Sequence, residues 1–320
     1  MKKTTFIEKW LTPMNKQNVP EIESAYQVRF SQEYTVLFEH CLAYLNRLMS
    51  DPKYVCHLLR TEMKNLALLE NDNLYLFLPE ITPSEFERLH ADSISAYIRL
   101  VTRDVSKEYL KINNFYLFER YHHNILSRSS EEVILSTYKI SGLFGAEYAT
   151  LRNTVNKIEK ELIAQYSPLE KNDYPKLQEL SDRWLITQGK KYSMNKKEID
   201  ESYLGFFLRE RGDNFISRKI YFNGALCGVA LIEIVRPGFG VYIMNKCLNG
   251  IMIQGQMYGI SGLSKYLYYR TCKELRERNI SFLNVGSLGI EKGARKSKEE
   301  LRPLEVRLES YQIEYEKPHS

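Results

Sequence analysis

The stretch Leu283–Pro303 reads LNVGSLGIEKGARKSKEELRP and joins an apolar strand-like segment, a glycine-bearing turn and a basic cluster. Arg295, Lys296 and Lys298 lie within four residues of one another, just after Gly293. Their cationic ends could therefore meet one polyanion or one developing negative charge, although many such clusters are only solvated. The stretch predicts a phosphate or oxyanion contact between a strand and a closing proline.

The composition is that of an ordinary globular protein. The chain has 320 residues, 43% hydrophobic and 27% charged, enough for one large core or two domains of about 150 residues each. A net charge of +5 and a pI near 8.7 permit contact with nucleic acid or acidic headgroups without requiring it.

Compartment signals favour a cytoplasmic protein. Five cysteines lie far apart without a CxxC pair, which is typical of reduced, buried thiols. The first residues are basic but lack the apolar region of a secretory signal. No apolar run approaches the roughly 20 residues of a membrane span, so we expect no transmembrane segment.

The first half shows mixed helical and strand periodicity. Apolar residues recur at three- and four-residue steps over 33–49, which predicts an amphipathic helix. Asn73–Leu78 is a short apolar run typical of a strand, and Ser84 with Glu87 predicts a capping box for the following helix. A basic helix is expected over 147–165, as a connector between halves or a tRNA contact.

The second half predicts strand, hairpin, strand, loop, helix and strand in that order. Asn223-Gly224 supplies the positive φ of a type I′ turn between two strands. An amphipathic helix is expected over 174–185, a third strand over 240–244 and a second helix over 262–278. A strand leading into the basic stretch completes the series.

Three motifs in this half resemble one enzyme family. They are LSDRWL (180–185), NVG (284–286) and GARKSKEELRP (293–303). Their order resembles the catalytic domain of phosphatidylglycerol lysyltransferases, where a strand ending Asn-Leu-Gly precedes Gly-Leu-Arg-x-Phe-Lys-x-x-Phe-x-Pro. Ala294, Ser297 and Leu301 depart from that pattern, and residues 285–288 replace an acidic run that soluble relatives often carry.

The resemblance implies an α/β fold with mixed sheets, built as two tandem GNAT-like acyltransferase domains related to Fem aminoacyltransferases. It implies a degenerate N-terminal domain over 1–168 and a catalytic domain over 169–320. The sequence itself shows no repeat period that would reveal such a duplication.

The implied reaction transfers an aminoacyl group from aminoacyl-tRNA to an amine or hydroxyl of a small-molecule, peptide or lipid acceptor. Such an ester is already activated, so the enzyme must align the partners, accept a proton and stabilise an oxyanion. No cofactor is required, and the six histidines lack metal-ligand spacing. The candidate catalytic residues are Lys298 and Arg295 as cations and Glu233 as general base; the candidate substrate-binding residues are Asn284, Gly286 and Tyr242.

Two other hypotheses stay open. The segment QMYGIS (256–261) is similar to the Gln/Arg-x-x-Gly-x-Gly/Ala loop with which GNAT enzymes hold the pyrophosphate of coenzyme A at a helix N-terminus. In that alternative an acyl-CoA is the donor, and Gln256, Gly259, Ser261 and Gly262 bind it. The other alternative is a non-catalytic GNAT-fold binding protein.

Overall fold

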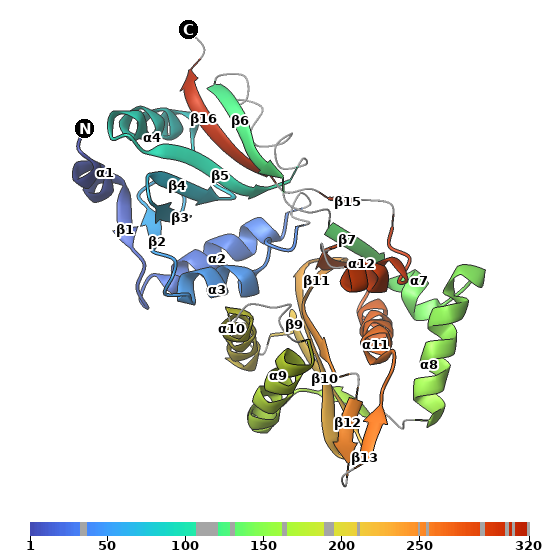
Figure 1. Cartoon of the computed structure of the whole chain (residues 1–320). Coiled ribbons are helices and arrows are strands. Elements are labelled where there is room, and N and C mark those ends of the chain that lie inside the picture. Colours follow the sequence, from blue (N-terminus) through green and yellow to red (C-terminus); the bar gives the residue numbers. More distant parts are fainter. Residues whose placement is uncertain are drawn as a thin grey trace. The chain divides into compact units, whose positions relative to one another are not determined.

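The computed structural model describes residues 1–32, 37–106, 121–128, 132–161, 165–188, 195–209, 212–248, 250–253, 256–288, 292–304, 307–308 and 311–318 (Figure 1). The chain divides into two compact units. Unit 1 comprises Met1–Glu131 together with Leu308–Ser320, and unit 2 comprises Glu132–Arg307. Each unit has its own sheet and its own covering helices.

Unit 1 is built on a seven-stranded sheet of the described residues, in the order β1-β2-β3-β4-β5-β16-β6. Only β4 and β5 pair in parallel among these neighbours, and the remaining pairs are antiparallel. The strands are β1 (Leu11–Pro13), β2 (Cys56–Leu59), β3 (Asn65–Glu70), β4 (Asn73–Phe77), β5 (Arg99–Val105), β6 (Tyr121–Arg128) and β16 (Tyr311–Pro318). The helices are α1 (Lys3–Trp10), α2 (Val19–Phe30), α3 (Leu42–Ser50) and α4 (Pro83–Ser95).

Unit 2 repeats this plan, with the described strands in the order β8-β9-β10-β11-β14-β7-β15. Its strands are β7 (Glu132–Ser136), β8 (Gln165–Pro168), β9 (Phe215–Phe222), β10 (Ala225–Arg236), β11 (Phe239–Cys247), β14 (Phe282–Ser287) and β15 (Arg307–Leu308), with a separate hairpin of β12 (Gly250–Ile253) and β13 (Gln256–Gly259). The helices are α7 (Thr137–Gly142), α8 (Ala149–Glu161), α9 (Tyr174–Gln188), α10 (Asn195–Arg209), α11 (Leu263–Glu277) and α12 (Lys292–Glu299).

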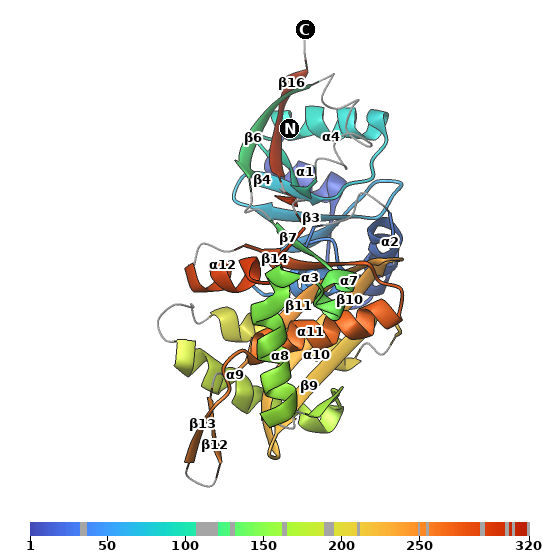
Figure 2. The same ribbon diagram turned by 90° about the vertical axis from the view of Figure 1, so that its right-hand side faces the viewer.

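Helices cover both faces of the unit 2 sheet. The pair α9 and α10 lies on one face, and α11 lies on the other with α7 and α8 packed beside it (Figures 1 and 2). Arg218 of β9 binds Glu274 of α11, whereas its neighbour Lys219 binds Asp173, which immediately precedes α9. Successive side chains of β9 therefore face different helical layers.

The two sheets share one strand order. In each sheet, a strand that is remote in the sequence pairs beside the parallel pair. In unit 1 the parallel pair β4–β5 is followed by β16, from the C-terminal segment. In unit 2 the parallel pair β11–β14 is followed by β7, which precedes every other strand of that sheet. The matching order confirms the two tandem GNAT-like folds.

The positions of β7 and β16 correct the expected domain boundary. A division at 168/169 would separate β7, α7 and α8 from unit 2 and would leave β16 outside unit 1. Each of these strands instead completes the sheet in which its backbone groups are paired, because an unpaired strand edge exposes N–H and C=O groups. The units therefore change over at residues 131/132 and again at 307/308.

Most local predictions agree with the structure, but two helix starts differ. Asn223 and Gly224 have φ values of 46° and 76° between β9 and β10, as the predicted hairpin requires. Helix α3 begins only at Leu42, and residues 33–36 lie outside the described part of the chain. The capping box of α4 is formed by Thr82 and Glu85, two residues earlier than the predicted pair.

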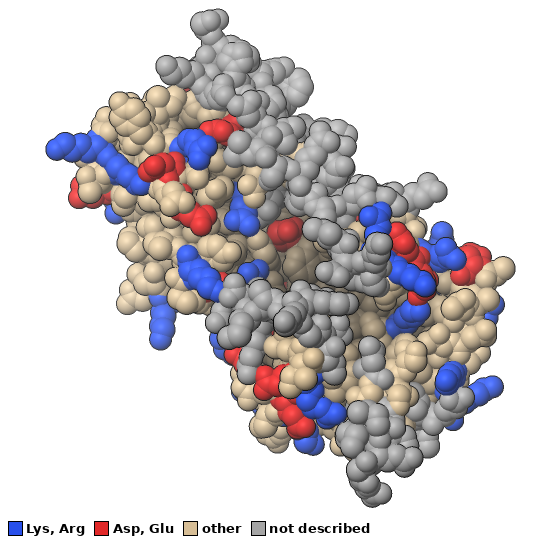
Figure 3. All heavy atoms as spheres, in the orientation of Figure 1, with Lys and Arg blue, Asp and Glu red and all other residues tan. Residues whose placement is uncertain are grey.

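The positive charge belongs to unit 2. Residues 132–307 contain 28 Lys and Arg against 20 Asp and Glu, a formal charge of +8, and the rest of the chain has 17 against 20, or −3. On the face drawn in Figure 3, basic and acidic side chains of the described residues are interspersed. The net charge therefore favours an anionic partner for unit 2 through many separated cations.

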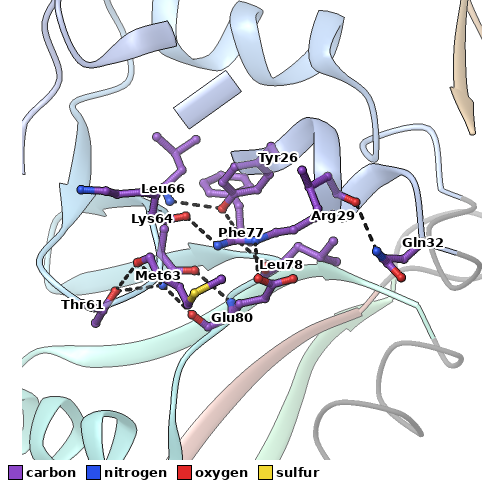
Figure 4. Close-up of polar contacts among 12 residues, drawn as sticks. Tyr26, Arg29, Gln32, Thr61, Met63, Lys64, Leu66, Phe77, Leu78 and Glu80 are labelled. Carbon is purple, nitrogen blue, oxygen red and sulfur yellow. Dashed lines mark hydrogen bonds and ion pairs between the residues drawn. The ribbon is translucent and has the colours of Figure 1, made fainter. Parts of the chain in front are cut away.

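In unit 1, Tyr26 of α2 satisfies two backbone groups of neighbouring strands (Figure 4). Its hydroxyl accepts a hydrogen bond from the Leu66 N–H at 3.1 Å and donates to the Phe77 carbonyl. Tyr26 is 1% exposed, so water cannot replace either bond. The tyrosine thus fixes α2 across β3 and the end of β4.

Arg29, one turn further along α2, also ties this helix to the strands (Figure 4). It is 1% exposed, pairs with the Glu80 carboxylate at 3.3 Å and donates to the Lys64 carbonyl at 2.6 Å. Its guanidinium carbon lies 4.5 Å from the Tyr26 ring centroid. A buried arginine needs such partners, because an unpaired buried charge is very costly.

We expect Tyr26→Phe to lower the free energy of unfolding by about 1–3 kcal/mol, because it leaves a buried N–H and a buried carbonyl without this hydroxyl. Urea unfolding monitored by circular dichroism would measure the change. Tyr97→Phe is the matched control, since Tyr97 is 89% exposed. Equal stabilities of the two variants would contradict this role of the Tyr26 hydroxyl.

Candidate functional site

The candidate site lies where the parallel pairing of unit 2 ends. Strands β11 and β14 pair only over 239–241 and 282–284, although β11 continues to Cys247 and β14 to Ser287. In unit 1 the corresponding pair stays in register along all of β4, over 73–77. Only the unit 2 pair therefore leaves a long stretch of one strand beyond the described pairing.

A bulge at this point sets the path of β14. Gly286 has a φ of 72°, in the left-handed region that favours glycine, and its N–H donates to the Asn284 Oδ1 at 2.7 Å. The register between β14 and β7 shifts between Asn284 and Ser287. The Asn284 amide nitrogen donates in turn to the Glu132 carboxylate of β7. The predicted substrate residues Asn284 and Gly286 thus form one buried turn.

Lys298 of α12 reaches the same turn. Its Nζ donates to the Val285 carbonyl at 2.6 Å and to the Ser287 carbonyl. Burial lowers the pKa of Lys298 from 10.5 to about 8, and the negative charge of Glu132 acts in the opposite direction. The structure therefore brings three predicted residues together and adds Glu132, which the sequence analysis missed. A glutamate opening an apolar strand, EVILS, was the available signal.

Arg295 does not accompany Lys298. Its side chain is 50% exposed and pairs with Glu299 one turn along α12, with Nε 3.0 Å from the carboxylate oxygen. An exposed pair at this spacing contributes little stability. The two predicted cations therefore turn to different partners, and only Lys298 contacts β14.

Glu233 lies inside the core rather than at an exposed strand end. It is 3% exposed, and β10 continues beyond it to Arg236. Glu233 is directly opposite Phe215 of β9, whose ring packs against Phe206 and Phe207 of α10. The carboxylate is therefore on the face covered by α10.

A buried ion pair shares that face. Lys246 of β11 pairs with Asp200 of α10, at side-chain exposures of 2% and 1%. The Lys246 Nζ also lies 3.2 Å from the Ser181 hydroxyl and 4.8 Å from the centroid of the Trp184 ring on α9. The sequence analysis missed Lys246, although a lysine within the apolar strand 239–247 indicates a buried partner.

Tyr242 points to the opposite layer. It is 3% exposed, and its ring centroid is 4.8 Å from that of Tyr268 on α11. Burial raises the pKa of Tyr242 well above its usual value, with a smaller contribution from Tyr268. Tyr242 and Glu233 therefore lie on different faces of the sheet.

The segment resembling a coenzyme A loop has another local structure. Gln256 and Gly259 are the ends of strand β13, paired with Ile253 and Gly250 of β12. Ser261 and Gly262 follow as a turn before α11.

Gly262 serves helix packing. It has a φ of 86°, and a Cβ there would lie 2.3 Å from the Thr154 Cγ2 of α8. A close approach of α8 to the first turn of α11 therefore explains this glycine without a phosphate. Binding of an acyl-CoA by these four residues remains a prediction.

Two kinds of feature were sought in the part of the chain that the structure describes: a metal-binding cluster and a membrane-spanning helix. No group of three or more His, Cys, Asp or Glu in that part could hold a metal ion. None of its helices combines the length and apolar character needed to cross a bilayer.

The fold matches solved structures over nearly the whole chain. A conserved protein of unknown function from Bacteroides thetaiotaomicron VPI-5482 aligns with a TM-score of 0.75 at 13% identity, covering 96% of this chain and 99% of that one. The C-terminal domain (DUF2156) of a putative lysylphosphatidylglycerol synthetase from Agrobacterium fabrum gives 0.61 at 14% identity, covering 93% and 92%. FemX gives 0.58 at 8% identity, covering 95% and 97%.

These likenesses confirm the fold that the sequence resemblance implied, that of the lysyltransferase and Fem structures. No protein-family model matches the chain, and a search of curated proteins gives no match either.

We expect Asn284→Ala to lower the free energy of unfolding by about 2–4 kcal/mol, because Asn284 is 0% exposed and bridges the Gly286 N–H to a buried carboxylate. Arg295→Gln should change it by less than about 0.5 kcal/mol, since the pair that it breaks is exposed. Chemical denaturation of both variants would measure the difference. An Asn284→Ala protein as stable as Arg295→Gln would show that the turn does not depend on this amide.

Proposed function

We propose that this chain is an acyltransferase that moves an aminoacyl group from aminoacyl-tRNA to an amine or hydroxyl acceptor. The proposal is carried by one observation: a half-buried lysine with a lowered pKa is held at the bulged end of β14, where pairing with β11 has ended. The fold shared with lysylphosphatidylglycerol synthetase and FemX supports the reaction class. The net charge of +8 in unit 2 supports an RNA-linked donor.

In this reaction the acceptor attacks the ester carbonyl, its proton passes to a base, and the tRNA hydroxyl leaves. An ammonium group has three N–H donors, and the carbonyls of Val285 and Ser287 take two from Lys298. The third can donate to the oxyanion of the tetrahedral intermediate. Because the two carbonyls fix the ammonium beforehand, little reorganisation is needed when charge develops.

Glu233 is the base in this proposal. Its burial on the α10 face keeps the carboxylate out of bulk water, and in this proposal it accepts the proton of the acceptor. Arg295, exposed on α12, would contact tRNA phosphates rather than the reacting ester.

We expect Lys298→Met to reduce the rate of aminoacyl transfer by about 10²–10³, the usual loss when one preorganised oxyanion donor is removed. Arg295→Gln should mainly raise the KM for charged tRNA. The assay would follow release of radiolabelled amino acid from a charged tRNA pool to candidate amine, peptide and lipid acceptors, with acetyl-CoA as a separate donor. Wild-type rates for folded Lys298→Met, or transfer from acetyl-CoA alone, would refute the proposal.

The rate of transfer should fall as the pH rises through about 8. The pKa of Lys298 is lowered to about 8, so its ammonium is present below that pH and is lost above it. In Lys298→Arg the decline should disappear, because a guanidinium stays protonated throughout. Single-turnover rates corrected for spontaneous ester hydrolysis would test this. A rate that rises through pH 8 and needs Lys298 would instead assign the neutral amine as a base.

A further inference from the structure

Two aromatic rings lie exposed and in contact on unit 2, at the start and the end of the helix α7 region. Tyr138 is 55% exposed and Phe144 is 62% exposed, with ring centroids 6.2 Å apart. The guanidinium carbon of Arg276 on α11 lies 4.5 Å from the Tyr138 centroid. We call Tyr138, Phe144 and Arg276 the aromatic platform. Its helices, α7 and α11, pack together on the side turned to the viewer in Figure 2.

The turn after α7 is built so that Phe144 stays on the surface. Leu143 and Gly145 on either side have φ values of 49° and 93°, and the Arg152 guanidinium donates to both of their carbonyls. A Cβ on Gly142 would lie 2.2 Å from the Phe144 Cε2, so this glycine leaves room for the ring. A ring held in place in advance loses little conformational entropy when a ligand binds.

The surroundings of the platform carry cations. Lys139 on α7 and Lys273 on α11 are both exposed, and Lys273 is three residues before Arg276 on the same helix face. Two exposed acidic residues, Glu147 and Glu277, also lie nearby in the chain. Cations next to flat aromatic rings are the combination that binds single-stranded nucleic acids, in which phosphates alternate with unstacked bases.

We propose that the aromatic platform stacks unpaired nucleotides of an RNA. Tyr138 and Phe144 supply faces for successive bases, and Arg276, Lys139 and Lys273 attract the phosphates between them. Duplex RNA would not fit this role, because its bases are already stacked on one another.

The platform is separate from the candidate reaction centre. Thr137, which begins α7, binds the carbonyls of Ile280 and Ser281 just before β14, whereas Lys298 binds carbonyls at the other end of that strand. Five residues of strand span roughly 16 Å. The platform would therefore hold nucleotides away from the reacting ester. That this RNA is the donor tRNA rests on the proposed function.

The test measures RNA binding directly, without any transfer step. Fluorescence anisotropy with a labelled ten-nucleotide single-stranded RNA should show that Tyr138→Ala and Phe144→Ala each weaken binding by about 5- to 100-fold. Arg276→Gln should weaken it less and reduce the salt dependence by about one phosphate contact. Tyr138→Trp should keep or improve affinity. Tyr97→Ala, which removes an isolated exposed ring from unit 1, is the matched control and should change nothing.

Unchanged affinity in the two alanine variants would overturn the platform, and so would an equal loss for heparin, which offers charge without bases. Thermal unfolding of each variant would show that the fold is retained. If the folded wild-type protein transfers aminoacyl groups but the alanine variants bind the single-stranded RNA as tightly as wild type, the platform fails and the proposed function stands. If the platform binds RNA but no transfer occurs, the proposed function fails alone.

Discussion

The structure depends on backbone pairing at the edge of each parallel strand pair, which an antiparallel strand must cover. Strand β14 would present an unpaired edge beside β11, and strand β5 would do so beside β4. Strand β7, the first strand of unit 2, covers the first edge, and β16, from the C-terminal segment of unit 1, covers the second. Unit 1 is therefore discontinuous in the sequence, because its sheet is completed by a strand that follows unit 2, whereas unit 2 is continuous and opens with β7.

Strand β7, which pairs with β14, also shapes the candidate site. Its pairing with β7 shifts register beside Gly286, and this bulge turns two carbonyls toward Lys298. Glu132, at the start of β7, accepts a hydrogen bond from the side-chain amide of Asn284. Its negative charge also offsets part of the lowering of the Lys298 pKa that burial causes. Bulges commonly redirect side chains near functional sites. Strand β7 therefore covers the edge of β14 and also supplies the carboxylate whose charge acts on Lys298.

The two units use this common plan differently. In unit 1, Tyr26 and Arg29 tie α2 to the strand ends, and the parallel pair stays in register along β4. In unit 2 the pairing ends after three residues, and charged groups such as Glu233 and Lys246 are buried on the α10 face. Burying charge is costly unless it is paired or used. Both units bury charge, Arg29 in unit 1 and Glu233 and Lys246 in unit 2, but only in unit 2 does the parallel pairing end early.

Elements with local signals could be predicted from the sequence. Asn223-Gly224 predicts its hairpin because few residue pairs tolerate two positive φ angles, and the apolar spacing of 262–278 predicts α11. The motif residues Asn284, Gly286 and Lys298 also indicated one site, because they are close in the sequence. Tertiary structure alone decided the domain boundary, the separation of Arg295 from Lys298, and the burial of Glu233. It also showed that Gly262, which was predicted to bind the pyrophosphate of coenzyme A, lies in close contact with helix α8. Strand exchange and burial depend on contacts between residues far apart in the chain, and short-range periodicity carries no information about which partner a strand or charge will meet.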